Sequence, residues 1–191
     1  MRADAKKNYE RILAVAREVI AEQGVDASLR DIARRSGVGL ATLYRHFTTR
    51  EALLEALLQK ALCDLIARSE TLSDDHAPGA ALTTWFIEAT TFVHVFNGVV
   101  DLMAKALADP GSALHEDCKN LRAAGAKLLQ NAQQAGVVRE DVDGGDLFAL
   151  IGAAGWIGDQ PAFDDRANRL ANFIANALMC RPQEVVSAKL P

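Results

Sequence analysis

A chain of 191 residues, 50% hydrophobic and 24% charged, has the composition of one or two compact globular units, which excludes a disordered or fibrous protein. It has no apolar run of the ~18 residues that a membrane span needs and no apolar signal core, so we expect a cytoplasmic protein without membrane contact. Its three cysteines are widely spaced and odd in number, so we expect no disulfide framework. The net charge of −4 divides unevenly: residues 1–60 hold 11 Lys and Arg against 8 Asp and Glu, whereas residues 61–191 hold 10 against 17. A basic front and an acidic rear suit a chain that presents its front to a polyanion.

Helical periodicity dominates the sequence, and alternating β-branched runs are almost absent. In the front part, apolar residues three and four apart predict a first helix that ends at Gly24 and a second helix between Ser28 and Gly37. A third helix is expected over residues 40–46. The T-x-x-E pattern that starts at Thr48 is typical of a capping box, so we expect it to begin a long fourth helix.

The fourth helix is expected from residue 49 to about residue 70, and residues 73–79 are the best candidate for a linker. Five further helices are predicted, over residues 82–100, 102–108 and 114–135, after a cap at Asp143, and over residues 170–178. Pro161 is expected to break the chain between the last two. The predicted fold is all-α with about nine helices, divided into a front unit over residues 1–55, a rear unit over 56–182 and a tail over 183–191.

The third helix and the turn before it carry the strongest functional signal. Residues 42–46 place hydroxyl, phenol, guanidinium and imidazole groups on one short helix, while Leu43 and Phe47, four apart, share a face that can anchor it. Gly37 permits the tight turn that sets the second and third helices nearly perpendicular. The arrangement is typical of a helix-turn-helix, whose second helix reads the major groove of DNA.

The chemistry of this region matches the groups that DNA offers. Arg45 can form two hydrogen bonds with guanine or hold a phosphate, and Leu40 can contact a thymine methyl group. The bare backbone of Gly39 can approach a phosphate closely, although it caps a helix less well than serine. Arg50 lies in the first turn of the fourth helix, where backbone amides attract phosphate. The remaining candidates are Ala41 and Thr42, which would face the groove, and Tyr44 and His46, whose polar tips suit phosphate oxygens.

Three linked segments carry a family resemblance. In order, they read I-L-A-V-A-R-E-V-I-A-E-Q-G, L-R-D-I-A-R-R-S-G-V-G and T-L-Y-R-H-F-T-T-R-E-A-L-L. They resemble the DNA-binding domain of the TetR/AcrR family of bacterial transcription regulators over roughly the first third of the chain, which implies a nucleoid-associated bacterial protein. The resemblance implies that the DNA backbone is held by Thr42, Tyr44 and His46, and that bases are read or contacted by Leu40, Ala41 and Arg45. It also implies that Ser28 matches the family's phosphate-contacting hydroxyl before the second helix. Arg50 matches the basic residue that opens the fourth helix. Gly39 departs from the pattern, since many members have Ser or Thr there.

The resemblance also implies a rear unit that binds a small ligand and forms a homodimer. Bulky side chains there could enclose a mostly apolar ligand, and they are Trp85, Phe86, Phe92, Phe96, Met103, Phe148 and Trp156. A plain core role fits each of them as well. The last two helices have wide apolar faces, which favours pairing with a second copy of the chain rather than only closure of their own core. The residues expected at this interface are Leu147, Leu150, Ile151, Ala154, Leu170, Phe173, Ile174 and Ala177.

We therefore expect a homodimeric repressor that binds a pseudo-palindromic operator in double-stranded DNA and is released by a small-molecule effector. Two alternatives remain open: an effector-independent, nucleoid-type DNA-binding protein, and an all-helical enzyme or carrier. Against an enzyme, the sequence has no paired His and Cys at metal-binding spacing, no phosphate-cradling glycine loop and no nucleophile motif. We expect no catalytic residue, no metal and no cofactor.

Overall fold

The computed structural model describes residues 2–24, 27–96, 99–160 and 162–180. Over these ranges the chain is all-α, as predicted, with nine α-helices, one short 3₁₀ helix and an isolated bridge between Val138 and Met179. The α-helices are α1 (Arg2–Gln23), α2 (Leu29–Arg35), α3 (Leu40–His46), α4 (Arg50–Asp75), α5 (Pro78–Val95), α6 (Val99–Ala108), α7 (His115–Gln134), α8 (Gly144–Gly158) and α9 (Ala167–Ala177). The expected break at Pro161 and the expected tail over residues 183–191 lie outside the described residues.

The helices of the front part end where the sequence indicates. Gly24 follows α1 with φ +79°, and Gly37 follows α2 with φ +64°, so both residues adopt the left-handed conformation that favours glycine. Ser28 occupies the N-cap position of α2, but its side chain makes no capping hydrogen bond. The bounds of α3 coincide with the predicted residues 40–46.

Two expectations about α4 are wrong. Its N-cap is Thr49 rather than Thr48, because the Thr49 hydroxyl accepts a hydrogen bond from the backbone nitrogen of Ala52 at 3.1 Å. The helix also continues to Asp75, so the first three residues of the linker expected over residues 73–79 are helical. Pro78 then begins α5, since proline is tolerated in the first helical turn. Only His76 and Ala77 separate these helices, so no extended linker lies between α4 and α5.

The rear helices follow the predicted order with shifted boundaries. The helix expected over residues 82–100 ends at Val95, and α6 begins at Val99 rather than at residue 102. Gly136, with φ +68°, follows α7 as expected. Asp143 caps α8 in a complete capping box: its carboxylate accepts from the backbone nitrogens of Gly145 and Asp146, and the Asp146 carboxylate accepts from the backbone nitrogen of Asp143.

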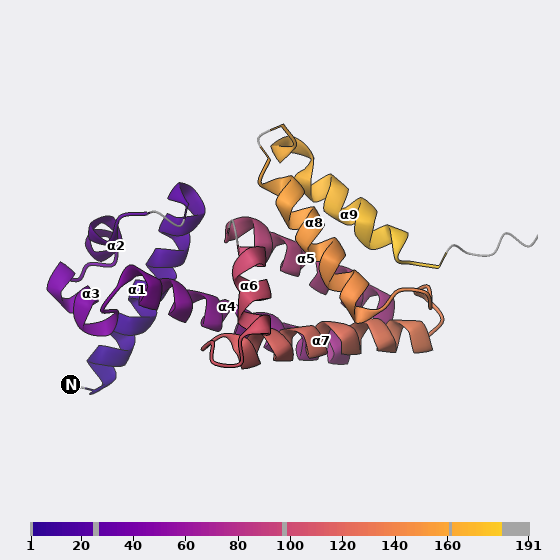
Figure 1. The fold of residues 1–191 in the computed structure, drawn as a ribbon, viewed down its shortest axis with the longest axis horizontal. Helices are drawn as coiled ribbons and strands as arrows, with labels where there is room; N and C mark the ends of the chain where they lie inside the picture. The colour runs from indigo at the N-terminus through magenta and orange to yellow at the C-terminus, as the bar shows by residue number, and fades with distance from the viewer. Residues whose placement is uncertain (1, 25–26, 97–98, 161, 181–191) are drawn as a thin grey trace, which may run out of the picture.

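Figure 1 shows α1, α2 and α3 clustered at one end of the molecule, with α4 leading from them into the rear helices. There α4 packs against α5 and α7, and α8 packs against α5 and α9. Trp85 is fully buried and donates from Nε1 to the backbone oxygen of Leu65 at 2.9 Å, and Arg68 forms an ion pair with Glu88 at 3.0 Å. These contacts fasten α5 to α4, the helix that joins the two ends of the molecule.

Two further observations concern the cysteines and the length of the apolar helices. The three cysteines, Cys63, Cys118 and Cys180, are free. In the part of the chain that the structure describes, no single helix is long and apolar enough to cross a membrane. Among these residues, α5 and α6 are together long and apolar enough, but the pair is bent by 102°. Both of these helices bury residues in the protein core, including Trp85 and Ala106.

Candidate nucleic-acid interface and rear cavity

The anchoring side of α3 is formed by Leu43 and Phe47. Leu43 is fully buried, and Phe47, the residue after the helix, is buried with its ring stacked on Tyr9 of α1 at a centroid distance of 5.1 Å. At the start of the helix, Gly39 has an extended backbone, and its carbonyl accepts from the backbone nitrogens of Thr42 and Leu43 at 2.8 and 3.1 Å. A seven-residue helix is unstable alone, so this burial is what holds α3 in place.

The opposite side of α3 presents polar groups to solvent. Tyr44 is 45% exposed, and Ala41 and Arg45 are also exposed, while Leu40 and Thr42 are half-buried. The Arg45 guanidinium donates from Nη2 to the Thr42 hydroxyl at 2.8 Å, which keeps the cation along the helix rather than extended away from it. A phenol, a guanidinium and a hydroxyl are thus accessible on one helix, and these are groups that donate to base edges and phosphates.

The other predicted DNA-contacting residues surround α3 in different environments. His46 is half-buried, and its ring lies edge-on to Tyr9 at 6.1 Å, so part of its role is packing. Arg50 is half-buried at the first position of α4. Ser28 is exposed, and because its hydroxyl does not cap α2, it remains accessible to a phosphate oxygen.

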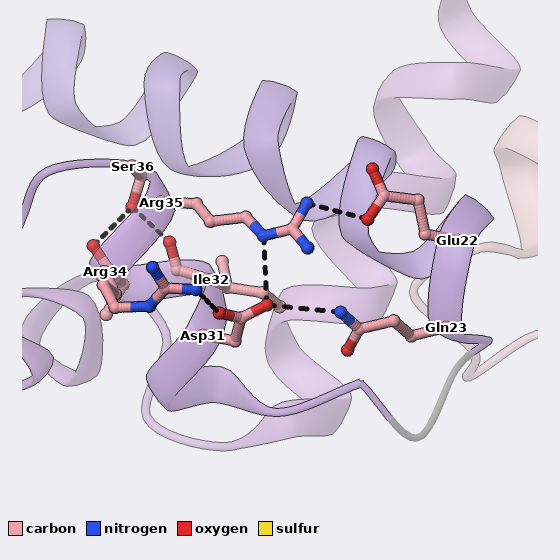
Figure 2. A network of polar contacts seen from close by, with 8 residues as sticks. Glu22, Gln23, Asp31, Ile32, Arg34, Arg35 and Ser36 are labelled. Atoms are coloured by element: carbon pink, nitrogen blue, oxygen red, sulfur yellow. Dashed lines mark hydrogen bonds and ion pairs between the residues drawn. The ribbon is translucent and has the colours of Figure 1, made fainter.

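Asp31 holds α2 against α1, a role that the sequence analysis did not assign. Its carboxylate accepts hydrogen bonds from Arg34 and from Gln23 of α1, and it pairs with Arg35 at 3.1 Å. Arg35 also reaches Glu22 of α1 at 2.7 Å, so two helices share one network, as Figure 2 shows. The hydrogen bond from Arg34, followed by that from Gln23 and by the positive charges of Arg35 and Arg34, lowers the pKa of Asp31 below its ordinary value. The spacing of Asp31 from Arg34 and Arg35 could have indicated part of this network.

The rear helices α5, α6, α7 and α8 surround a cavity of about 240 Å³. Three of the seven predicted pocket residues, Phe92, Met103 and Phe148, line it. The other four do not: Trp85, Phe86 and Phe96 are buried in the surrounding core, and Trp156 is 60% exposed at the surface. The lining includes residues that the sequence analysis missed, namely Ala89, Val93, Val100, Ala104, Leu107, Leu121, Arg122, Gly145, Ala149, Ile151 and Gly152.

Several exposed apolar residues lie on the outer sides of α8 and α9. Of the eight predicted interface residues, Leu147, Ile151 and Ala154 are instead buried inside the subunit, where the inner side of α8 packs on α5. Leu150, Leu170 and Ile174 are half-buried, and Phe173 and Ala177 are exposed. The outer side of α8 carries two exposed residues that the sequence analysis did not assign to the interface, Ala153 and Trp156. We call the exposed residues Ala153, Trp156, Phe173 and Ala177 the α8–α9 face.

Two family models match the chain. Residues 12–57 match the bacterial regulatory proteins of the tetR family, and residues 77–179 match the C-terminal domain of SbtR-like transcriptional regulators. The second match alone covers more than half of the chain. No group of three or more His, Cys, Asp or Glu within the described ranges is placed to hold a metal ion.

Individual proteins show the same similarity. Helix-turn-helix-type transcriptional regulators of Staphylococcus aureus are 38% identical over 77 residues, a segment that spans 40% of this chain and 42% of the length of those relatives. A TetR transcriptional regulator from Streptomyces coelicolor has a similar structure, with 30% identity and a TM-score of 0.73 over 91% of this chain and 99% of that one. A TetR transcription regulatory protein from Mycobacterium vanbaalenii is 31% identical, with a TM-score of 0.63 over 94% and 99%. These matches are to transcriptional regulators and not to enzymes.

Proposed function

Because the chain belongs to the TetR family of bacterial DNA-binding transcriptional regulators, we propose that it is a homodimeric repressor released from its operator by a small, mostly apolar ligand. The observation that carries this proposal is the two-sided character of α3, buried through Leu43 and polar through the accessible Tyr44 and Arg45. Such a helix can be inserted in the major groove without disturbing the fold. The protein would act on the chromosome, in the bacterial cytoplasm.

The proposed interface divides into groups that read bases and groups that hold the backbone. Arg45, with Leu40 and Ala41 beside it, faces the bases in this arrangement, because a guanidinium can bond guanine in the major groove. The backbone is held by Ser28, Thr42, Tyr44, His46 and Arg50, with Gly39 allowing close approach. The network around Asp31 supports this arrangement, since it fixes α2 and thereby the turn that presents α3.

Dimerisation is supported by the α8–α9 face. Phe173 is 76% exposed and Trp156 60% exposed, so an isolated subunit would leave large aromatic surfaces in water. Pairing this face about a two-fold axis would place two copies of α3 on one DNA duplex, with half-sites ~34–36 Å apart. A pseudo-palindromic operator follows from that symmetry.

Release by a ligand is supported by the connection between the cavity and α4. Phe92 of α5 lines the cavity, and the same helix is fastened to α4 through Trp85 and Glu88. A ligand that moves α5 would therefore move α4 and change the separation of the two α3 helices. The change requires that the ligand bind one arrangement more tightly than the other.

The proposal predicts that α3 carries sequence-specific binding. Fluorescence anisotropy would measure binding to DNA from upstream of the protein's own gene, with a scrambled duplex as competitor. We expect Arg45→Ala to weaken operator binding by ~10-fold or more, because a base contact of this kind is worth about 1–3 kcal/mol. Tyr44→Ala should weaken operator and scrambled duplex alike.

Lys127→Ala is the matched control, because Lys127 is an exposed cation on α7, away from α3. It should bind the operator as the unmodified protein does. Unchanged binding by both α3 variants would disprove the assignment of this helix. Equal affinity of the unmodified protein for operator and scrambled duplex would favour a nucleoid-type protein instead.

A further inference from the structure

The cavity between α5, α6, α7 and α8 has one charged side chain among the residues that line it, and that side chain is Arg122 of α7. All other lining residues are apolar or glycine. A cavity with an apolar wall and a single polar group orients its ligand through that group. The chemistry of Arg122 therefore indicates which ligand the cavity selects.

Arg122 packs on the cavity wall instead of pairing with a carboxylate. Its Cζ atom lies 5.6 Å from the centre of the Phe148 ring, and Phe148 itself lines the cavity. Within the described ranges no carboxylate forms an ion pair with Arg122, whereas Arg35 pairs with Glu22 and Arg68 with Glu88. Arg122 lines the cavity and is exposed, so its donors are accessible. An arginine fork in this position matches a carboxylate.

Neighbouring charges and amides do not offer an equivalent site. On α7, Lys119 pairs with Glu116 at 3.0 Å. At the start of α8, next to the lining residue Gly145, the first backbone amides already donate to the carboxylate of Asp143. An anion entering the cavity would thus find its donors on Arg122 rather than at the N-terminus of α8.

We propose that the cavity selects an amphipathic monoanion, with an apolar body among Phe92, Met103 and Phe148 and a carboxylate on Arg122. This proposal rests on the effector role proposed above and names the chemical class of that effector. About 240 Å³ has room for roughly eight water-sized groups, at ~30 Å³ each, which suits a medium-chain carboxylic acid. The apolar wall excludes a second charge, because burying an unpaired charge is costly.

Isothermal titration calorimetry tests this selection with two matched series: straight-chain carboxylates from hexanoate to decanoate, and primary alcohols of the same lengths. In the unmodified protein we expect the best carboxylate to bind at least ~10-fold more tightly than its alcohol, because a charge-assisted bond distinguishes them. Arg122→Gln should bring this ratio close to one while alcohol binding is unchanged. Arg122→Lys should retain part of the preference, because it keeps the charge but not the planar fork.

Lys127→Gln is the matched control, one turn or more along α7 from Arg122 and absent from the cavity lining. It should keep the full preference. Equal binding of acids and alcohols by the unmodified protein, or a preference that survives in Arg122→Gln, would overturn the proposal. Either result would still be compatible with an effector bound in this cavity. If Arg122→Gln weakened both series alike, the side chain would act by shaping the cavity, which also overturns it. Failure of both series to bind would also contradict the effector role of the cavity. The proposed DNA-binding function would be unaffected, because it is measured separately.

Discussion

Single polar side chains add to the apolar contacts that hold the short helices of the DNA-binding part. Asp31 accepts from Gln23 on the preceding helix and from Arg34 and Arg35 on its own, and this joins α2 to α1 in addition to the apolar core that Ile32 and Ala33 enter. An isolated surface ion pair contributes little, but a shared carboxylate with several donors fixes a geometry. The position of α3 depends on this geometry, since α3 packs on α2.

At this scale we predict that Asp31→Asn lowers the melting temperature by a few degrees at neutral pH. The pKa of Asp31 is held below its ordinary value of 3.8, so its contribution to stability is present above that pH and is lost as the pH falls through the lower, folded value. The difference between the two proteins should therefore disappear in acid. Thermal unfolding followed by circular dichroism from neutral to acidic pH measures it.

Asp64→Asn is the control for this prediction, because Asp64 forms an exposed pair with Lys60 on the same helix at 2.8 Å. It removes a carboxylate without separating two helices, so its effect at neutral pH should be smaller. A stability difference between Asp31→Asn and the unmodified protein that persisted unchanged at the most acidic pH would contradict the explanation.

At the scale of the element, the crossing of α5 and α8 depends on the absence of a side chain. A Cβ atom on Gly155 would lie 2.2 Å from Cγ1 of Val93 and 2.5 Å from its Cβ, so the two backbones are too close for any larger residue. One turn earlier, a Cβ on Gly152 would meet Val100 at 3.6 Å, an ordinary contact. Of these two glycines, Gly155 sets the separation of α5 and α8, whereas a Cβ at Gly152 would fit without any shift.

We predict that Gly155→Ala destabilises the protein by about 1–3 kcal/mol, because overpacking of a stiff, buried valine outweighs the gain of up to ~1 kcal/mol that alanine gives a helix. Gly152→Ala, the matched control, should be neutral or stabilising for the same propensity reason. Urea unfolding at one fixed protein concentration compares them. Equal stability of the two variants would show that α5 and α8 can separate at little cost.

At the scale of the whole molecule, the α8–α9 face and α3 have to act together. The front helices lie at one end of the molecule, and α8 and α9 pack side by side at the other (Figure 1). Each subunit in the proposed dimer would therefore extend from the two-fold axis to its own half-site. Loss of dimerisation should then reduce operator binding without any change near α3, because one half-site contact alone is weak.

We predict that Phe173→Asp converts the protein to a monomer and weakens operator binding by ~100-fold or more, since binding of the second half-site is no longer intramolecular. Sedimentation equilibrium measures the first effect and fluorescence anisotropy the second. Leu102→Asp is the matched control, because Leu102 is also exposed, at 44%, but lies on α6 outside the α8–α9 face. A dimer that persisted in Phe173→Asp would place the interface elsewhere.

The sequence by itself determined the features that depend on neighbours along the chain. The bounds of α3, the glycines that end α1, α2 and α7, and the division of α3 into a buried and an accessible side all follow from residues within one or two helical turns. The physical reason is that a positive φ and an i, i+4 face are local properties. The family resemblance has the same origin, because its motifs lie within these short segments.

Only the tertiary structure decided which apolar residues face a cavity, a core or solvent. The apolar residues of α8 are so numerous that their periodicity does not show which side of the helix faces the core. Leu147 and Ile151, which the sequence places at the interface, are therefore buried, and Trp156, which it places in the pocket, is exposed. In the same way, Trp85 enters the core because Gly125 of α7 admits its ring, with atoms 2.7 Å from where a Cβ would lie. These outcomes depend on which helix backbones approach one another, and that is a property of residues far apart in the chain.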